Sequence, residues 1–106
     1  MTRTAKKLIQ SALSTVISTM ATGVAGGRTQ VTQIFLANNG TATRYVTLYA
    51  HGTVAANVLL PKIEIYPESG KILDNLKIVL AAGETLSAKQ DTGTDVILTA
   101  YGVEEA

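Results

Sequence analysis

Apolar and polar residues alternate along most of the chain after Val24, in short runs that end at Gly, Asn, Asp or Pro. Alternation with a period of two is typical of strands that bury one face. The runs are 29–37, 43–50, 58–66, 76–80, 85–89 and 96–103. Roughly seven or eight short strands, with a turn about every eight to twelve residues, predict an all-β antiparallel sandwich or jelly-roll domain over residues 22–106.

The same alternation predicts which side chains share a face, because successive residues of a strand point to opposite sides. In the run 29–37, one face carries Thr32, Ile34 and Leu36, and the other carries Val31, Gln33 and Phe35. In the run 43–50, one face carries Val46, Leu48 and Ala50, and the other carries Tyr45, Thr47 and Tyr49. For this second run the pattern leaves open which face is buried.

Two turn residues constrain how the strands connect. Asn39 and Gly40 give the strongest hairpin signal in the chain, because Asn-Gly fits a type I′ turn whose twist matches that of its strands. Pro61 has no amide hydrogen for a β-ladder, so its strand begins there or lies at a sheet edge.

Residues 1–21 have no clear strand pattern and are predicted to form an N-terminal arm. Apolar residues recur there at spacings of three and four, which fits one face of a helix; they are Ala5, Leu8, Ile9, Ala12, Leu13, Val16, Ile17 and Met20. Residues 14–19 are hydroxyl-bearing or β-branched and form helices poorly. We therefore predict a basic arm that is helical or extended over 6–13 and extended from Thr15 onward.

Composition narrows the possible functions. The chain has 106 residues, enough for one domain with a single core. It has no cysteine and one histidine, which excludes disulfides and thiolate metal sites. The net charge of +1, without a basic run, gives no electrostatic footprint for nucleic acid. No apolar run approaches the roughly 20 residues that span a bilayer, so no membrane partner is expected.

The candidate chemical groups are few. His51 could act as a general base, but no Ser, Cys or carboxylate lies near it in the sequence, which favours a loop or interface histidine. Asp91 and Asp95 flank a Gly turn and could hold calcium, although the ligand set is incomplete and Asp is common in turns. We therefore predict a protein that is not an enzyme and has no cofactor or metal.

Four segments together resemble a family of small virion proteins of tailed bacteriophages. They are 28–39, 44–49, 79–86 and 96–104, the last of which ends in Tyr-Gly-Val-Glu. Such proteins carry a Gly-rich turn, a strand that ends in Ala-Asn, a Thr-rich partner strand, an Ala-Gly-Glu-Thr turn and a terminal Gly-Val-Glu. The likeness covers about residues 22–105 and lends no support to the arm. The sequence departs from the family pattern at Ala25 and Gly26, where members of the family often carry Pro.

The resemblance implies a β-sandwich virion protein of the capsid-decoration or cement type, assembled in the host cytoplasm. Its expected partners are the major capsid protein or other virion proteins and copies of itself, as a homotrimer. The expected interface residues are Lys6, Lys7, Leu8, Ile9 and Leu13 of the arm, with Tyr45 and Tyr49 of the domain. Deletion of residues 1–13 is expected to weaken attachment and leave the domain folded.

Two other functions fit the sequence. One is a structural role in the neck, tail or baseplate of the same kind of particle. The other is a carbohydrate-binding module in which Tyr45 and Tyr49 line the sugar site, because aromatic side chains on one strand face can form a stacking surface.

Overall fold

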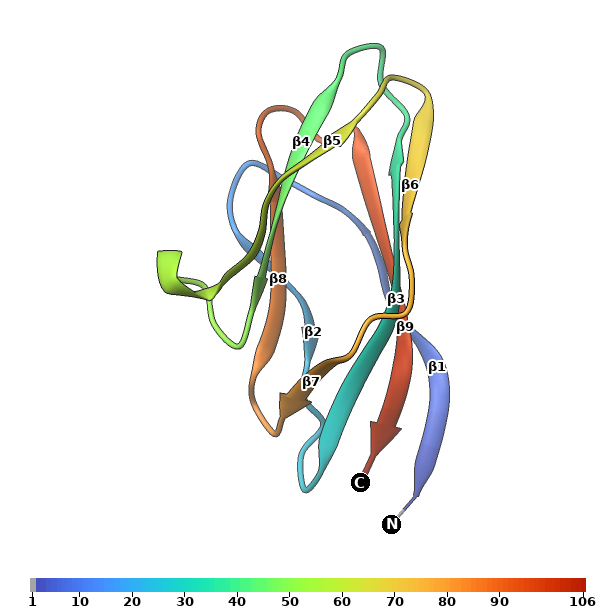
Figure 1. The fold of residues 1–106 in the computed structure, drawn as a ribbon, viewed down its shortest axis with the longest axis vertical. Coiled ribbons are helices and arrows are strands. Elements are labelled where there is room, and N and C mark those ends of the chain that lie inside the picture. Colours follow the sequence, from blue (N-terminus) through green and yellow to red (C-terminus); the bar gives the residue numbers. More distant parts are fainter. Residues whose placement is uncertain (1) are drawn as a thin grey trace.

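The computed structural model describes residues 2–106, which form two antiparallel β-sheets packed face to face (Figure 1). In sheet A the order is β1 (Arg3–Ala12), β9 (Val96–Glu105), β3 (Arg28–Asn38) and β6 (Ser69–Leu73), and β7 (Ile78–Ala81) also pairs with β3. In sheet B the order is β2 (Ser18–Thr22), β8 (Thr85–Gln90), β4 (Arg44–Ala50) and β5 (Val58–Ile65). A short 3-10 turn, Ala55–Asn57, lies between β4 and β5.

The connections between strands define a jelly roll. Consecutive strands lie in different sheets, except for the β4–β5 hairpin and the pair β6 and β7, which share one edge of sheet A. Two four-position sheets joined in this order form the jelly-roll arrangement, with β6 and β7 together taking one position. The predicted all-β antiparallel sandwich is confirmed, with nine strands among residues 2–106 in place of the expected seven or eight.

The N-terminal segment is part of the sandwich. β1 pairs with β9 from Arg3 to Ala12, and β2 pairs with β8, so the segment contributes an edge strand to each sheet and is not a separate arm. The helical alternative for residues 6–13 is wrong. A β-bulge at Leu8 lets Leu8 and Ile9 both pack against the core, although they are adjacent in sequence. Met1, the first residue of the predicted arm, lies outside the described residues.

A second bulge changes the face assignment in β3. Val31 pairs with Gly102 and Gln33 pairs with Tyr101, which leaves Thr32 as the extra residue. Because the bulge adds one residue, Val31 points to the same side as Ile34, and both are fully buried. The prediction that Val31 and Ile34 lie on opposite faces is therefore wrong.

The segment after β3 is a corner between the two sheets, so the predicted Asn39–Gly40 hairpin is wrong. The side-chain amide of Asn38 donates to the carbonyl oxygens of Ala42 (2.8 Å) and Ile65 (3.1 Å). Its side-chain oxygen accepts from the backbone amide of Gly40 at 2.9 Å. One buried side chain thus ties β3 to the turn and to β5 in the other sheet.

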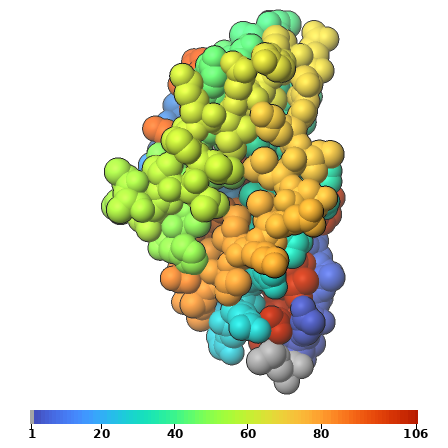
Figure 2. All heavy atoms as spheres, viewed as in Figure 1, coloured from blue at the N-terminus to red at the C-terminus, as the bar shows by residue number. Residues whose placement is uncertain are grey.

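The core lies between the sheets and contains side chains from both. Val46, Leu48 and Ala50 of β4 point inward, which settles the face that the sequence left open. Pro61 lies in β5, which pairs only with β4, so its predicted edge position is confirmed. Near the other end of the molecule, Thr2 and Ala106 exchange backbone hydrogen bonds of 2.9 and 3.1 Å, and the described N-terminal and C-terminal residues lie close together (Figure 2).

Candidate interaction surfaces

The predicted interface residues of the N-terminal segment lie on β1 and just after it. Lys6 donates to Glu104 at 3.2 Å, and Lys7 donates to Gln10 at 3.3 Å. Leu8 and Ile9 are half-buried against the core. Leu13 is 1% exposed, so it belongs to the core and has no surface to offer a partner.

The outer side of sheet A forms a nearly uncharged surface, here called the sheet A outer face. Its members are matched across the strand ladders, and all of them except the buried Thr99 are at least partly exposed; they are Ala5, Lys7, Gln10 and Ala12 of β1, Val103, Tyr101, Thr99 and Ile97 of β9, Gln30, Gln33, Phe35 and Ala37 of β3, Ile72 of β6 and Val79 of β7. Lys7 is the one charged residue in this set. The surface is therefore built of apolar, hydroxyl and amide groups.

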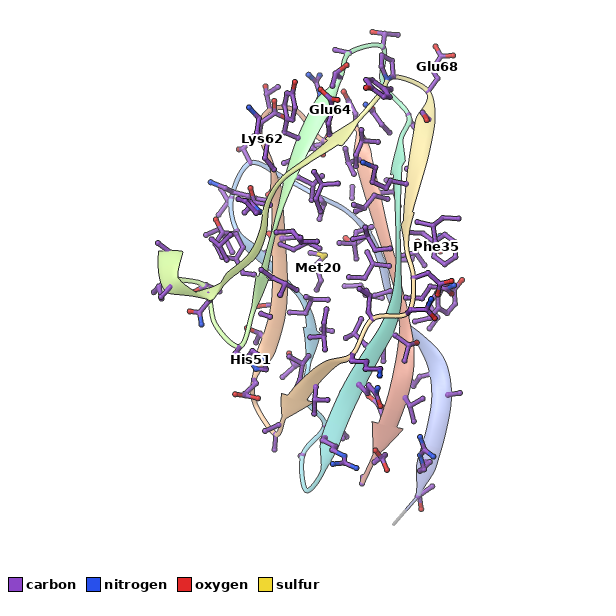
Figure 3. All side chains as sticks on the ribbon, in the orientation of Figure 1. Met20, Phe35, His51, Lys62, Glu64 and Glu68 are labelled. Atoms are coloured by element: carbon purple, nitrogen blue, oxygen red, sulfur yellow. The ribbon has the colours of Figure 1, made fainter. Side chains whose placement is uncertain are left out.

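Large apolar side chains gather in the middle of this face. The rings of Phe35 and Tyr101 meet edge to face, with their centroids 5.7 Å apart. Ile72, which pairs with Phe35 across the β3–β6 ladder, is 60% exposed, and Tyr101 is 40% exposed. Figure 3 shows Phe35 pointing away from the interior, whereas Met20 lies between the sheets. Sequence alternation predicted that Phe35 and Ile34 lie on opposite faces of their strand. The residues that contact Phe35 could not be predicted in this way, because they depend on the strand register.

Charges border the sheet A outer face. At one end, Glu105 of β9 accepts from Arg28 of β3 at 3.0 Å and lies 3.4 Å from Arg3 of β1. On the side of β6 and β7, Asp74 accepts a hydrogen bond from Gln33 at 3.1 Å. Lys77 lines the same shallow hollow as Gln33 and Asp74.

Tyr45 and Tyr49 do not form a joint exposed patch. Tyr49 is 6% exposed, although it lies on the face of β4 opposite the core residue Leu48. Tyr45 is half-buried; its hydroxyl donates to Glu64 at 3.1 Å and Lys62 lies 4.7 Å from its ring centroid. Tyr66 is 62% exposed. The pKa values of both Tyr45 and Tyr66 are raised, chiefly by hydrogen bonds to the Glu64 carboxylate.

His51 has a carboxylate partner that its sequence neighbours did not reveal. The ring Nδ1 lies 3.2 Å from Glu84 Oε1, which comes from the turn between β7 and β8. The pKa of Glu84 is lowered, first by the hydrogen bond from the backbone amide of Ala81 and then by the bond to His51. His51 itself follows β4 with a φ of 71°, so it lies in a loop as predicted.

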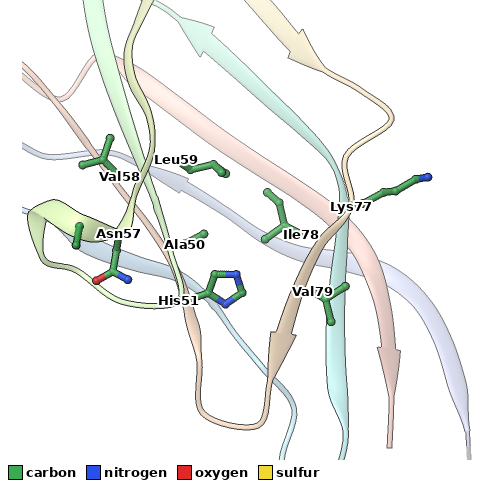
Figure 4. A pocket seen from close by; sticks show the side chains of 9 residues that line it. Ala50, His51, Asn57, Val58, Leu59, Lys77, Ile78 and Val79 are labelled. Carbon is green, nitrogen blue, oxygen red and sulfur yellow. The ribbon is translucent and has the colours of Figure 1, made fainter.

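His51 borders an open hollow of about 320 Å³ between the start of β5 and β7 (Figure 4). The other lining side chains are those of Ala50, Ala56, Asn57, Val58, Leu59, Lys77, Ile78 and Val79. A carboxylate can orient a histidine as a general base, but this lining offers neither a hydroxyl nor a thiol for the histidine to activate. The pair connects two loops and lacks the third member of a nucleophilic site.

The two candidate calcium ligands have structural partners. Asp95 forms an ion pair with Arg44 at 2.8 Å, and the carboxylate of Asp91 accepts from the backbone amide of Tyr45 at 3.0 Å. Within residues 2–106, no group of three or more His, Cys, Asp or Glu side chains is placed to hold a metal ion.

No protein-family model matches the sequence, and no curated protein matches it. Among the described residues, there is also no helix with the length and apolar character needed to cross a membrane.

Proposed function

We propose that this chain is a structural protein of a tailed-phage virion, of the capsid-decoration type, with no catalytic role. The resemblance of residues 22–105 supports the proposal, and so does the jelly-roll fold, which occurs in viral capsid domains. The partners are the major capsid protein or another virion protein, together with copies of the chain itself.

The observation that carries the proposal is the sheet A outer face. Ile72 and Tyr101 are exposed there beside Phe35, on a surface whose only internal charge is Lys7. Contiguous apolar surface of this kind marks contacts with other macromolecules. Tyr and Phe are also enriched at protein interfaces.

The fold suits repeated, shallow contacts. Thr2 and Ala106 extend the β1–β9 pairing at one end of sheet A, and Asn38 ties β3 to β5 at a corner towards the other end, so hydrogen bonds fix the strands near both ends. Many weak contacts, repeated by the symmetry of a particle, give high avidity without a deep binding site.

Quantitative mass spectrometry of purified particles tests the proposal. On the order of hundreds of copies per particle support a head location, because a shell repeats its subunits many times. On the order of a dozen copies support a neck, tail or baseplate location. Absence of the chain from washed particles contradicts both. The trimer implied by the resemblance stays a prediction that a native mass of the free protein decides.

A second candidate function is carbohydrate binding, at a different place from the one expected. The Tyr45 hydroxyl donates to Glu64, and the same carboxylate raises the pKa of Tyr66, so two aromatic rings lie near one hydrogen-bond acceptor. Such a combination suits a sugar, because its apolar face stacks on a ring and its hydroxyls bond the carboxylate. A glycan array with wild type, Tyr66→Ala and the control Tyr101→Ala tests this. Equal signals for the three proteins, or no signal, exclude the site.

A further inference from the structure

All four sheet edges carry features that discourage pairing with another strand. β1 has a bulge at Leu8 and exposed lysines, and β2 is five residues long with a bulge before Ala21. β5 contains Pro61, and the edge opposite β1 is divided between the short strands β6 and β7. Bulges, proline, lysine and short length are the known means by which proteins block edge-to-edge association. We therefore expect copies to contact each other through the faces of the sheets and not by pairing of edge strands.

The residues of the sheet A outer face, together with the charged residues that border it and Gly70, are ordered in rows that run across the strands. The first row is Arg3, Glu105 and Arg28, and the second row is Ala5, Val103, Gln30 and Val79. The third row is Lys7, Tyr101 and Gln33, with Asp74 beside Gln33. The fourth row is Gln10, Thr99, Phe35 and Ile72, and the fifth is Ala12, Ile97, Ala37 and Gly70. The third row thus has a cation at the β1 end and an anion at the opposite end.

We propose that two copies of this chain pair through their sheet A outer faces, about a two-fold axis parallel to the strands. Such an axis keeps each row at its own level and exchanges its two ends. Lys7 then faces Asp74 of the second copy, and Glu105 faces Arg28. The inference rests on the proposed function in one respect, since both take this face as a protein contact.

The central rows provide the apolar part of the contact. In this arrangement Thr99 packs over Phe35 of the second copy and Gln10 packs over its Ile72. Ile97 contacts Ala37 of the second copy. Two sheets that pack with aligned strands interdigitate side chains of this mixed size at a separation of about 10 Å. An axis perpendicular to the strands would instead place the Arg3–Glu105–Arg28 row against the uncharged fifth row, without a charge partner.

The size of the face is sufficient for a weak dimer. Four strands at a spacing of about 4.8 Å and ten residues at about 3.3 Å give roughly 600 Å² per copy. The pair would bury about 1,200 Å², near the lower end of specific interfaces. Weak and transient complexes are found at this small end of the size range, so we expect dissociation at roughly micromolar concentrations.

Sedimentation velocity of the purified chain, from about 1 µM to about 500 µM, measures this association. The expected result is a concentration-dependent shift from 11.1 kDa to twice that mass. Ile72→Lys should weaken the dimer at least about tenfold, because it puts an unpaired charge beside Phe35 among the apolar side chains of the contact. The matched control is Val54→Lys, since Val54 is 64% exposed but lies outside the face, and it should leave the dimer unchanged.

Charge reversal tests the orientation of the two copies. Lys7→Glu alone and Asp74→Lys alone should each weaken the dimer several-fold, because each faces like charges. The double variant should return to within about threefold of wild type, because both charge pairs are restored in reversed form. Lys77 lies beside Asp74, so recovery in the double variant, not net charge, identifies the pairing. A dimer that responds to Ile72→Lys without this recovery contradicts the two-fold arrangement.

The dimer and the trimer implied by the resemblance are competing predictions for the free chain. A monomer at every concentration, that trimer, or a dimer unaffected by Ile72→Lys overturns the inference. These results leave the proposed function standing if the chain is found on particles. Conversely, a dimer of the expected kind in a chain that is absent from particles supports the inference and refutes the proposed function.

Discussion

Replacement of Asn38 by alanine tests the corner that joins the two sheets. The variant loses three hydrogen bonds, two donated to the Ala42 and Ile65 carbonyls and one accepted from Gly40. Each is worth about 1 kcal/mol, and the carbonyl of Ile65, a residue that is 1% exposed, loses the bond from Asn38. We therefore expect the free energy of unfolding to fall by about 3 kcal/mol, and the melting temperature by about 12 °C or more.

Urea unfolding, monitored by circular dichroism, measures this change in the free energy of unfolding. Asn39→Ala is the matched control, because the Asn39 backbone amide keeps its bond to Asp95 at 3.0 Å whatever side chain it carries. It should stay within about 0.5 kcal/mol of wild type. Asn38→Asp should be at least as harmful as Asn38→Ala, since it turns a carboxylate toward two carbonyl oxygens. If Asn38→Ala unfolds within about 0.5 kcal/mol of wild type, Asn38 does not hold the corner.

Three further changes have defined outcomes. Deletion of residues 1–13 removes β1 and the buried Leu13, so the truncated chain should lose its cooperative thermal transition and not fold as a shortened domain. Ser87→Ala should raise the free energy of unfolding, measured by urea denaturation, by about 1 kcal/mol, because the Ser87 hydroxyl is buried without a hydrogen-bond partner. A loss of stability in this variant would contradict the prediction. The folded-state pKa of Glu84 lies below its ordinary value of 4.5, so its contribution to stability is present above pH 4.5 and disappears as the pH falls through the folded pKa. The difference in urea midpoint between wild type and Glu84→Gln should therefore shrink at acidic pH, and a constant difference would refute the role of the charge.

The strands after Val24 could be predicted because their burial follows a simple alternation. Val46, Leu48 and Ala50 are regular neighbours on one side of β4, and the period-two pattern grouped them correctly. The pattern failed at Val31, where the bulge at Thr32 adds a residue to one strand only. Nothing in the sequence from Val31 to Gln33 identifies a bulge, because its position depends on the partner strand β9.

Long-range pairing explains the other differences. β1 is stabilised by backbone bonds to β9, at the far end of the chain, so its local helix-like spacing was not decisive. Asn39 and Gly40 have hairpin composition, but the Asn38 side chain directs the chain across to the other sheet. Tyr49 is on the face opposite Leu48, as expected, and is nonetheless buried, which alternation along β4 alone does not reveal.

The thiol reactivity of the sheet A outer face on assembled particles tests the central claim most directly. The chain has no cysteine, so Ile72→Cys and the control Val54→Cys each introduce a single thiol at a site that is exposed in the isolated chain, 60% for Ile72 and 64% for Val54. We predict that maleimide labels the Val54→Cys particles and leaves the Ile72→Cys particles largely unlabelled, because protein covers the sheet A outer face. Labelling of Ile72→Cys at the same rate as Val54→Cys on intact particles would contradict the account.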